Sequence, residues 1–118
     1  MSVNENEVKT IRVPFERMVY ELLEQVSREW TGYLQEGYRN FVIDLGQVSF
    51  MDSASIGCLM DFYRKTKAAD GKIHLAAVQP RIETLLAIAK AKALFSMYGN
   101  VEDAIAAFET EGRHHEKN

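Results

Sequence analysis

The pattern of apolar and polar positions changes within residues 41–66 from that of a strand to that of a helix. The first part is a nearly continuous apolar run, typical of a short strand covered on both faces, and consists of Phe41, Val42, Ile43 and Leu45. From residue 56 onward the apolar positions follow the spacing of one helical face: Ile56, Leu59, Met60 and Tyr63. The helix should therefore begin near Asp52 or Ser53.

Strand and helix patterns also alternate before this stretch. Residues 8–13 predict a short strand that Pro14 closes, and an apolar stripe then predicts a helix of about five turns that ends at Gly37. The stripe consists of Met18, Val19, Leu22, Leu23, Val26, Trp30 and Tyr33. Its aromatic residues could instead bind a partner or a membrane, but a core-facing role is the favoured interpretation.

The alternation continues after residue 66 and predicts the fold class. We expect a turn at 69–71, a strand over 72–78, a helix over about 81–93 with Ala89 on its inner face, a short strand within 94–98 and a last helix capped by Asn100. His74 is expected to be a surface or satisfied strand residue. The order predicts an α/β fold: a small, mainly parallel or mixed β-sheet with about four helices packed on it. Residues 1–118 should form a single domain, with flexible tails over about 1–6 and 110–118.

Composition and charge narrow the function classes. The net charge of −3, the pI near 5.6 and the lack of a Lys/Arg cluster argue against nucleic-acid binding. No apolar run approaches the roughly 18 residues of a membrane span, and the polar N-terminus does not resemble a signal peptide, so we expect a cytoplasmic protein. We interpret Cys58 as a small buried apolar residue in the predicted helix. His114 and His115 lack further ligands, and we expect neither a metal nor a cofactor.

The predicted helix start near residue 52 is a place where an anion can be stabilised. Asp52 and Ser53 are both good N-cap residues, because their side chains accept hydrogen bonds from amide groups that the first turn leaves unpaired. The same end of a helix carries partial positive charge. A phosphate on Ser53 would therefore be tolerated, while the alternative is that Ser53 only caps the helix. Asp44 either lies near this loop or is a strand-end carboxylate in water.

The segment Phe41–Gly57 resembles the signature of STAS domains, the family named for sulphate transporters and anti-sigma-factor antagonists. Asp52 and Ser53 correspond to the Asp-Ser pair that opens a helix in the bacterial regulators of that family. A Leu-Gly or Ile-Gly follows there, and it is similar to Ile56-Gly57 here. Further similarity at 70–81 and 94–104 extends the resemblance over about residues 40–109.

The resemblance implies which serine carries phosphate. In the bacterial regulators a partner protein kinase phosphorylates the serine of the pair, which implies Ser53 as the phosphorylation site. The usual small Ser-Gly after the pair is replaced here by Ala54-Ser55, so Ser55 is an alternative site. Asp52 would cap the helix and orient the serine, or be a purely structural cap.

The resemblance also implies a binding module that is not an enzyme. Its unphosphorylated form would bind a serine-kinase anti-sigma factor through Asp52, Ser53, Ala54, Ser55 and Ile56, and so free a sigma factor; phosphorylation would release it. An alternative within the family is an accessory subunit that docks on a transporter ATPase or a larger sensory complex without phosphorylation. A serine hydrolase is disfavoured because the Gly-x-Ser-x-Gly motif is missing. A response-regulator receiver is disfavoured because no acidic pair follows the first strand.

The N-terminal third departs from the family pattern. Family members usually have two strands before the first long helix, whereas only about thirteen residues precede Pro14 here. One edge of the sheet should therefore be shortened. Such an edge would be either exposed or covered by self-association.

Overall fold

The computed structural model describes residues 3, 4 and 6–116, with only the backbone described for 111–116. The elements in chain order are β1 (Val8–Arg12), β2 (Arg17–Met18), α1 (Leu23–Glu36), β3 (Asn40–Asp44), β4 (Phe50–Met51), α2 (Ser53–Ala68), β5 (Lys72–Ala76), α3 (Pro80–Ile88), β6 (Ser96–Tyr98) and α4 (Val101–Glu116). Short 3-10 turns precede α1 at Tyr20–Leu22 and β6 at Lys92–Leu94.

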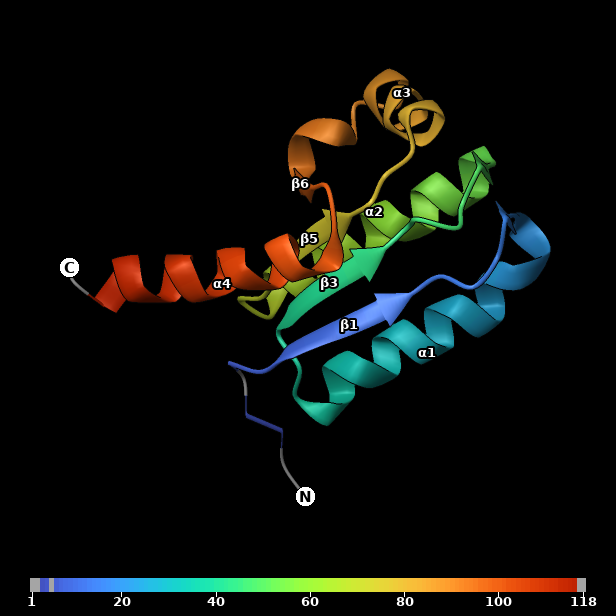
Figure 1. Cartoon of the computed structure of the whole chain (residues 1–118). Coiled ribbons are helices and arrows are strands. Elements are labelled where there is room, and N and C mark those ends of the chain that lie inside the picture. The colour runs from blue at the N-terminus through green and yellow to red at the C-terminus, as the bar shows by residue number, and fades with distance from the viewer. Residues whose placement is uncertain (1–2, 5, 117–118) are drawn as a thin grey trace.

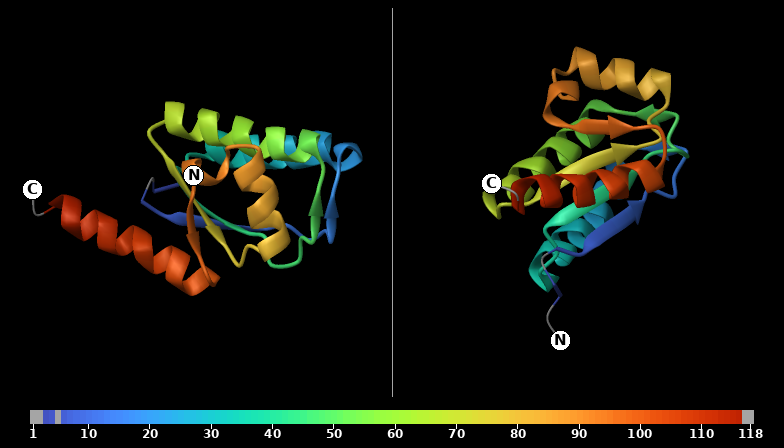
Figure 2. Two further views of the ribbon diagram at one scale, coloured as in Figure 1. Left: turned by 90° about the horizontal axis from the view of Figure 1, so that it is seen from above. Right: turned by 60° about the vertical axis from the view of Figure 1, so that its left-hand side comes forward.

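The main sheet is parallel and has the strand order β1-β3-β5-β6. Each crossover steps to the next strand in the same direction, so right-handed connections place the crossover helices on the same face. Figures 1 and 2 show α1 and α2 on that face and α4 on the opposite one. A second, two-stranded parallel sheet pairs Met18 of β2 with Met51 of β4.

The two faces of the sheet carry two separate cores, because successive residues of a strand point to opposite sides. Phe41 and Ile43 of β3 face α1 and α2 and belong to the large core. Its aromatic centre is Phe62 of α2, whose ring centroid lies 5.2 Å from Trp30 and 5.0 Å from Phe41. Val42 faces the other way and forms a small core under α4 with Ala76, Ala104 and Phe108.

A buried histidine anchors α4 to the sheet. His74 of β5 is fully buried, and its ring stacks on Phe108 with centroids 3.8 Å apart and planes 12° apart. Its Nδ1 lies 2.9 Å from the carbonyl oxygen of Ala104, a hydrogen bond that requires the proton on Nδ1. His74 is therefore a buried strand residue with a hydrogen-bonded Nδ1, and the surface role that was the alternative expectation is wrong.

The structure confirms the predicted α/β fold, with four α-helices on a mainly parallel sheet. The start of the first long helix was predicted wrongly. That helix begins at Leu23, and Met18 instead belongs to β2, where pairing with β4 outweighs its helical spacing from Leu22. Gly37 ends α1 as expected, with a φ of 111° that suits glycine.

Two further helix ends also differ from the prediction. Helix α3 ends at Ile88, because Lys90 has a φ of 61° and Ala91 N–H bonds to the carbonyl of Leu86; Ala89 is exposed and not on an inner face. Helix α4 continues to Glu116, past the predicted end near Thr110. The flexibility of the tails over 1–6 and 110–118 stays a prediction, and residues 1, 2, 5, 117 and 118 lie outside the described ones.

The turn before β5 requires a glycine at position 71, because the backbone of Arg39 lies too close for a side chain. A Cβ at this position would meet the carbonyl oxygen of Arg39, which already accepts a hydrogen bond from Lys72 N–H. We expect Gly71→Ala to lower the free energy of unfolding by about 1–3 kcal/mol through overpacking. Gly32→Ala is the control: nothing lies within 4 Å of its added Cβ, so it should stabilise α1 by about 0.5–1 kcal/mol. Urea unfolding measures both, and equal effects would contradict the steric explanation.

Candidate functional site

The Asp52-Ser53 pair lies where β4 meets α2, and α2 begins at Ser53 as the sequence predicts. Asp52 is the N-cap of α2, and its Oδ1 accepts a hydrogen bond of 2.8 Å from the N–H of Ser55. Its Oδ2 accepts a second one, of 2.9 Å, from the N–H of Tyr20. One carboxylate therefore joins the start of α2 to the segment between β2 and α1.

The hydrogen bonds to Asp52 favour its charged form. Hydrogen bonding from Ser55, and then from the backbone N–H of Tyr20, lowers the pKa of Asp52 below its ordinary value of 3.8, although burial acts the other way. The carboxylate is charged at neutral pH, and both of its oxygens hold backbone groups in place.

Asp52→Ala should lower the free energy of unfolding at pH 7 by about 1 kcal/mol, the usual effect of losing an N-cap. Because folding lowers the pKa of Asp52, its stabilisation is complete above the pKa of the unfolded chain and is lost as pH falls through the folded pKa. The difference between wild type and variant should therefore shrink below about pH 4. Urea unfolding from pH 3 to 7 measures it. Asp52→Asn, which keeps one acceptor oxygen, should have intermediate stability; a constant difference at all pH values would contradict this assignment.

Ser53 is the first residue of α2, and its side chain is exposed. The hydroxyl makes no hydrogen bond to another residue of the described part of the chain. It lies at the helix end where backbone N–H groups and the helix dipole favour negative charge. An incoming phosphoryl donor can therefore reach this hydroxyl without prior unfolding.

Ser55 lies in a different environment, although it is only two positions further on. It is fully buried, and its hydroxyl donates a hydrogen bond of 2.7 Å to the carbonyl oxygen of Met18. Ile56 is also buried, and Ala54 is half-buried. Of the five predicted partner-binding residues, Asp52, Ser53 and Ala54 thus reach the surface in this structure. Ser55 and Ile56 are buried beneath them.

Tyr20, which is 71% exposed beside this pair, was not among the residues predicted from the sequence. Arg17 of β2 lies three residues before Tyr20 in the chain, and the Arg17 guanidinium lies 4.2 Å from the centre of the Phe50 ring in β4. A large aromatic side chain so exposed is a common anchor for protein partners. A signal for it existed, because Tyr20 lies outside the apolar stripe that includes Met18 and Leu22.

The other expected residues have structural roles or lie apart. Asp44 accepts a hydrogen bond of 2.9 Å from Gly46 N–H and so stabilises the turn after β3. Cys58 is half-buried between α1 and α2, and burial raises the pKa of its thiol. Among the described residues, no three His, Cys, Asp or Glu side chains are grouped as a metal ion requires. Within the same residues, the helices are too short or too polar to cross a membrane.

Comparisons with known proteins agree with this geometry. The STAS domain family matches residues 7–104. BtrV of Bordetella bronchiseptica, named as a candidate anti-sigma factor antagonist, is 25% identical over 87 residues, which are 74% of this chain and 75% of the relative.

Several solved structures share the fold, and three of them illustrate it. The anti-sigma factor antagonist SpoIIAA of Bacillus, in its unphosphorylated form, has a TM-score of 0.76 at 21% identity over 93% of this chain and 94% of its own; its phosphorylated form has a TM-score of 0.68. The STAS domain of the SulP transporter of Vibrio cholerae has a TM-score of 0.65 at 24% identity over 86% and 88%. The family match, over residues 7–104, shows that this chain belongs to the STAS domain family.

Proposed function

We propose that this protein is an anti-sigma factor antagonist controlled by phosphorylation of Ser53. In its unphosphorylated form it binds an anti-sigma factor that is also a serine kinase, and this frees a sigma factor. Phosphorylation by the same kinase ends the association. The protein is then a substrate and a binding partner, and it catalyses no reaction itself.

The observation that carries the proposal is the contrast between Ser53 and Ser55 at the start of α2. Ser53 presents an exposed hydroxyl, while the hydroxyl of Ser55 is buried and bonded to Met18. A kinase needs the serine oxygen within reach of its bound nucleotide, which favours Ser53 as the acceptor. Ser55 would require the start of α2 to open first.

The charge of a phosphate explains how the switch could work without refolding. Phosphorylation adds close to two negative charges at neutral pH, next to the charged carboxylate of Asp52. The amide groups at the start of α2 favour the added charge, so the domain itself tolerates it. A partner packed against this surface meets both the charge and the bulk of the phosphate, and it is released.

Asp52 supports this function by positioning the serine. Its two oxygens accept hydrogen bonds from Ser55 and Tyr20, which holds the loop around Ser53 in one conformation. With both oxygens occupied and its pKa lowered, Asp52 is poorly suited to remove a proton from Ser53. We infer that the catalytic groups come from the kinase.

The competing function is that of an accessory subunit that docks on a transporter or a larger assembly without phosphorylation. The likeness to a transporter STAS domain shows the fold alone, and this fold hosts both kinds of protein. The exposed hydroxyl of Ser53 favours the phosphorylated switch. The edge strand β1 has five residues, like β3 and β5, so the expected shortening of this sheet edge is wrong; self-association through β1 stays a further prediction.

Phosphorylation by purified kinases tests the proposal directly. The protein is incubated with ATP and each serine kinase encoded beside its gene, and intact-mass measurement with peptide mapping locates the phosphate. We expect one phosphoryl group on Ser53, none in Ser53→Ala and unchanged incorporation in Ser55→Thr, which keeps the buried hydroxyl. Phosphate found on Ser55 instead would make Ser55 the phosphorylation site. If none of these kinases transfers phosphate to the protein, the accessory-subunit function would be favoured.

A further inference from the structure

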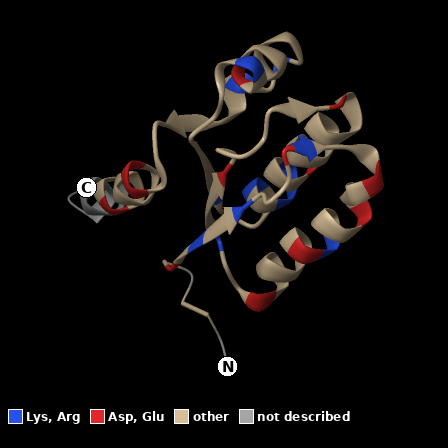
Figure 3. Ribbon diagram, turned by 45° about the vertical axis from the view of Figure 1, so that its right-hand side comes forward, with Lys and Arg blue, Asp and Glu red and all other residues tan. Residues whose placement is uncertain are grey.

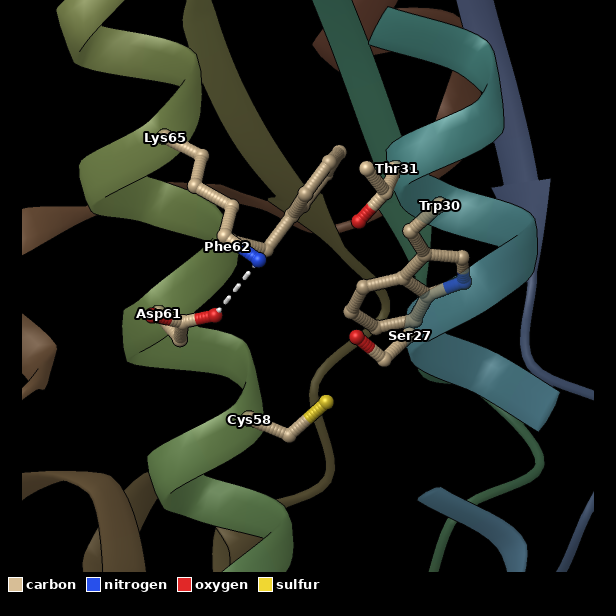
Figure 4. Close-up of a pocket in the computed structure, with 7 residues that line it drawn as sticks. All are labelled: Ser27, Trp30, Thr31, Cys58, Asp61, Phe62 and Lys65. Atoms are coloured by element: carbon tan, nitrogen blue, oxygen red, sulfur yellow. Dashed lines mark ion pairs between the residues drawn. The ribbon is translucent and has the colours of Figure 1, made fainter. Parts of the chain in front are cut away.

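A groove runs between α1 and α2 and begins beside the Asp52-Ser53 pair. Its outer part is a hollow of about 420 Å³ lined by Tyr20, Glu21, Leu23, Glu24, Ser27, Cys58 and Asp61. A smaller recess of about 10 Å³ continues inward and shares Ser27, Cys58 and Asp61 with it. Figure 4 shows the side chains of Ser27, Thr31 and Cys58 directed into the space between the two helices. Short side chains at these positions leave the groove open.

Two residues that line the outer hollow, Leu23 and Cys58, offer uncharged apolar surface. Leu23 and Cys58 are half-buried and lie on opposite walls. Burial, and then the nearby carboxylate of Asp61, raise the pKa of the Cys58 thiol, which is therefore neutral at physiological pH. An aliphatic side chain of a partner would bury apolar surface here.

The rim of the outer hollow is acidic. Its three charged residues are Glu21, Glu24 and Asp61, and no Lys or Arg lines it. Acidic residues also outnumber basic ones along the 3-10 turn and α1 (Figure 3). Glu24 pairs with Arg28 at 2.9 Å and Asp61 with Lys65 at 3.1 Å, but these pairs are solvent-exposed and exchange readily with cations from a partner.

The groove is continuous with the surface around Ser53. Tyr20, 71% exposed at its mouth, is tied to the phosphorylation loop through the hydrogen bond between its N–H and Asp52. Ala54, half-buried beside Ser53, lies one helical turn before Cys58 on the same face of α2. A partner that covers Ser53 can therefore reach the groove past Ala54 and Tyr20.

We propose that the groove between α1 and α2 is the second half of the docking surface and holds a segment of the partner kinase that places an Arg or Lys beside an aliphatic side chain. The aliphatic group lies against Leu23 and Cys58, and the cation lies between Glu21 and Glu24. This inference rests on the proposed function, because it identifies the occupant with the kinase that phosphorylates Ser53. It assigns to that kinase a positively charged contact surface outside its catalytic site.

Charge reversal in the groove tests the inference with the full-length protein and the kinase identified by Ser53 phosphorylation. The double variant Glu21→Lys/Glu24→Lys should weaken binding at least tenfold and reduce its dependence on salt concentration, as measured by calorimetry at low and high salt. The matched control is Glu36→Lys/Glu109→Lys, which has the same charge change on exposed helix positions away from the groove. It should bind within about twofold of wild type, the scale expected of peripheral charges.

A second variant tests the shape of the groove without changing its charge. Ser27→Trp should fill the space beside Cys58 and also weaken binding at least tenfold, with thermal unfolding used to confirm that the domain is folded. If the kinase phosphorylates Ser53 but both groove variants bind like wild type at both salt concentrations, the groove proposal is wrong and the proposed function stands. If no kinase phosphorylates Ser53, the proposed function fails, and the groove assignment fails with it.

Discussion

Phosphorylation of Ser53 is expected to weaken binding of the anti-sigma factor more than a hundredfold. Ser53 is exposed at the start of α2, so in the proposed complex its phosphate would lie in the contact surface and add charge beside Asp52. A loss of about 3 kcal/mol of binding free energy is enough for this effect. The measurement compares the affinity of phosphorylated and unphosphorylated protein for the same kinase by calorimetry, with a nucleotide that cannot transfer phosphate.

Controls separate the effect of charge from that of a changed fold. Ser53→Ala should bind within a few-fold of wild type, because it removes only a hydroxyl, and Ser53→Asp should be weaker than Ser53→Ala. Thermal unfolding of the phosphorylated protein should remain close to that of the wild type, since the helix end favours the added charge. Equal affinities of the two protein forms would refute the switch even if phosphate is found on Ser53.

Phe62→Ala should lower the free energy of unfolding by about 3–5 kcal/mol, the largest stability effect we expect from a single substitution. The Phe62 side chain is buried, and its ring contacts both Trp30 of α1 and Phe41 of β3. Its removal leaves a cavity where two helices meet the sheet. Because a small domain has a total stability of only about 5–15 kcal/mol, much of the protein could be unfolded at growth temperature.

Urea unfolding measures this loss, and two variants serve as controls. Phe62→Leu keeps most of the apolar volume and should cost clearly less than Phe62→Ala. Ile88→Ala removes a side chain that is 74% exposed, and its effect should be within about 0.5 kcal/mol of zero. A loss below about 1 kcal/mol for Phe62→Ala would contradict its central place in the core.

The local sequence pattern predicted an element correctly where the element depends only on its own residues. The apolar run at 41–45, the cap at Asp52 and the helix end at Gly37 each follow from side chains within one or two turns. Met18 was misassigned because its place depends on pairing with Met51, which is 33 positions away in the chain. Strands of two residues carry no periodicity, so β2 and β4 could not be recognised before the structure was known.

The candidate site was predicted in part for a similar reason. The position of Asp52 and Ser53 at the start of α2 was predicted correctly, but the pattern did not show that Ser53 is exposed and Ser55 buried. A signal was present, because Ser55 shares a helical face with Leu59, Phe62 and Thr66, all buried in α2. The role of Tyr20 at this site could not be predicted from local sequence, because its N–H donates a hydrogen bond to Asp52, which is 32 positions away in the chain.

The hydrogen bonds across this junction run in both directions, and under the proposed function they determine what the kinase would recognise. Met18 in β2 accepts the hydroxyl of Ser55, while Asp52 accepts the N–H of Tyr20. Ser53 therefore lies on a rigid surface formed by two segments that are distant in the sequence, and not on an extended peptide. A synthetic peptide copying residues 47–60 should be a poor substrate, and scanning proteomes for a linear consensus would overlook proteins of this type.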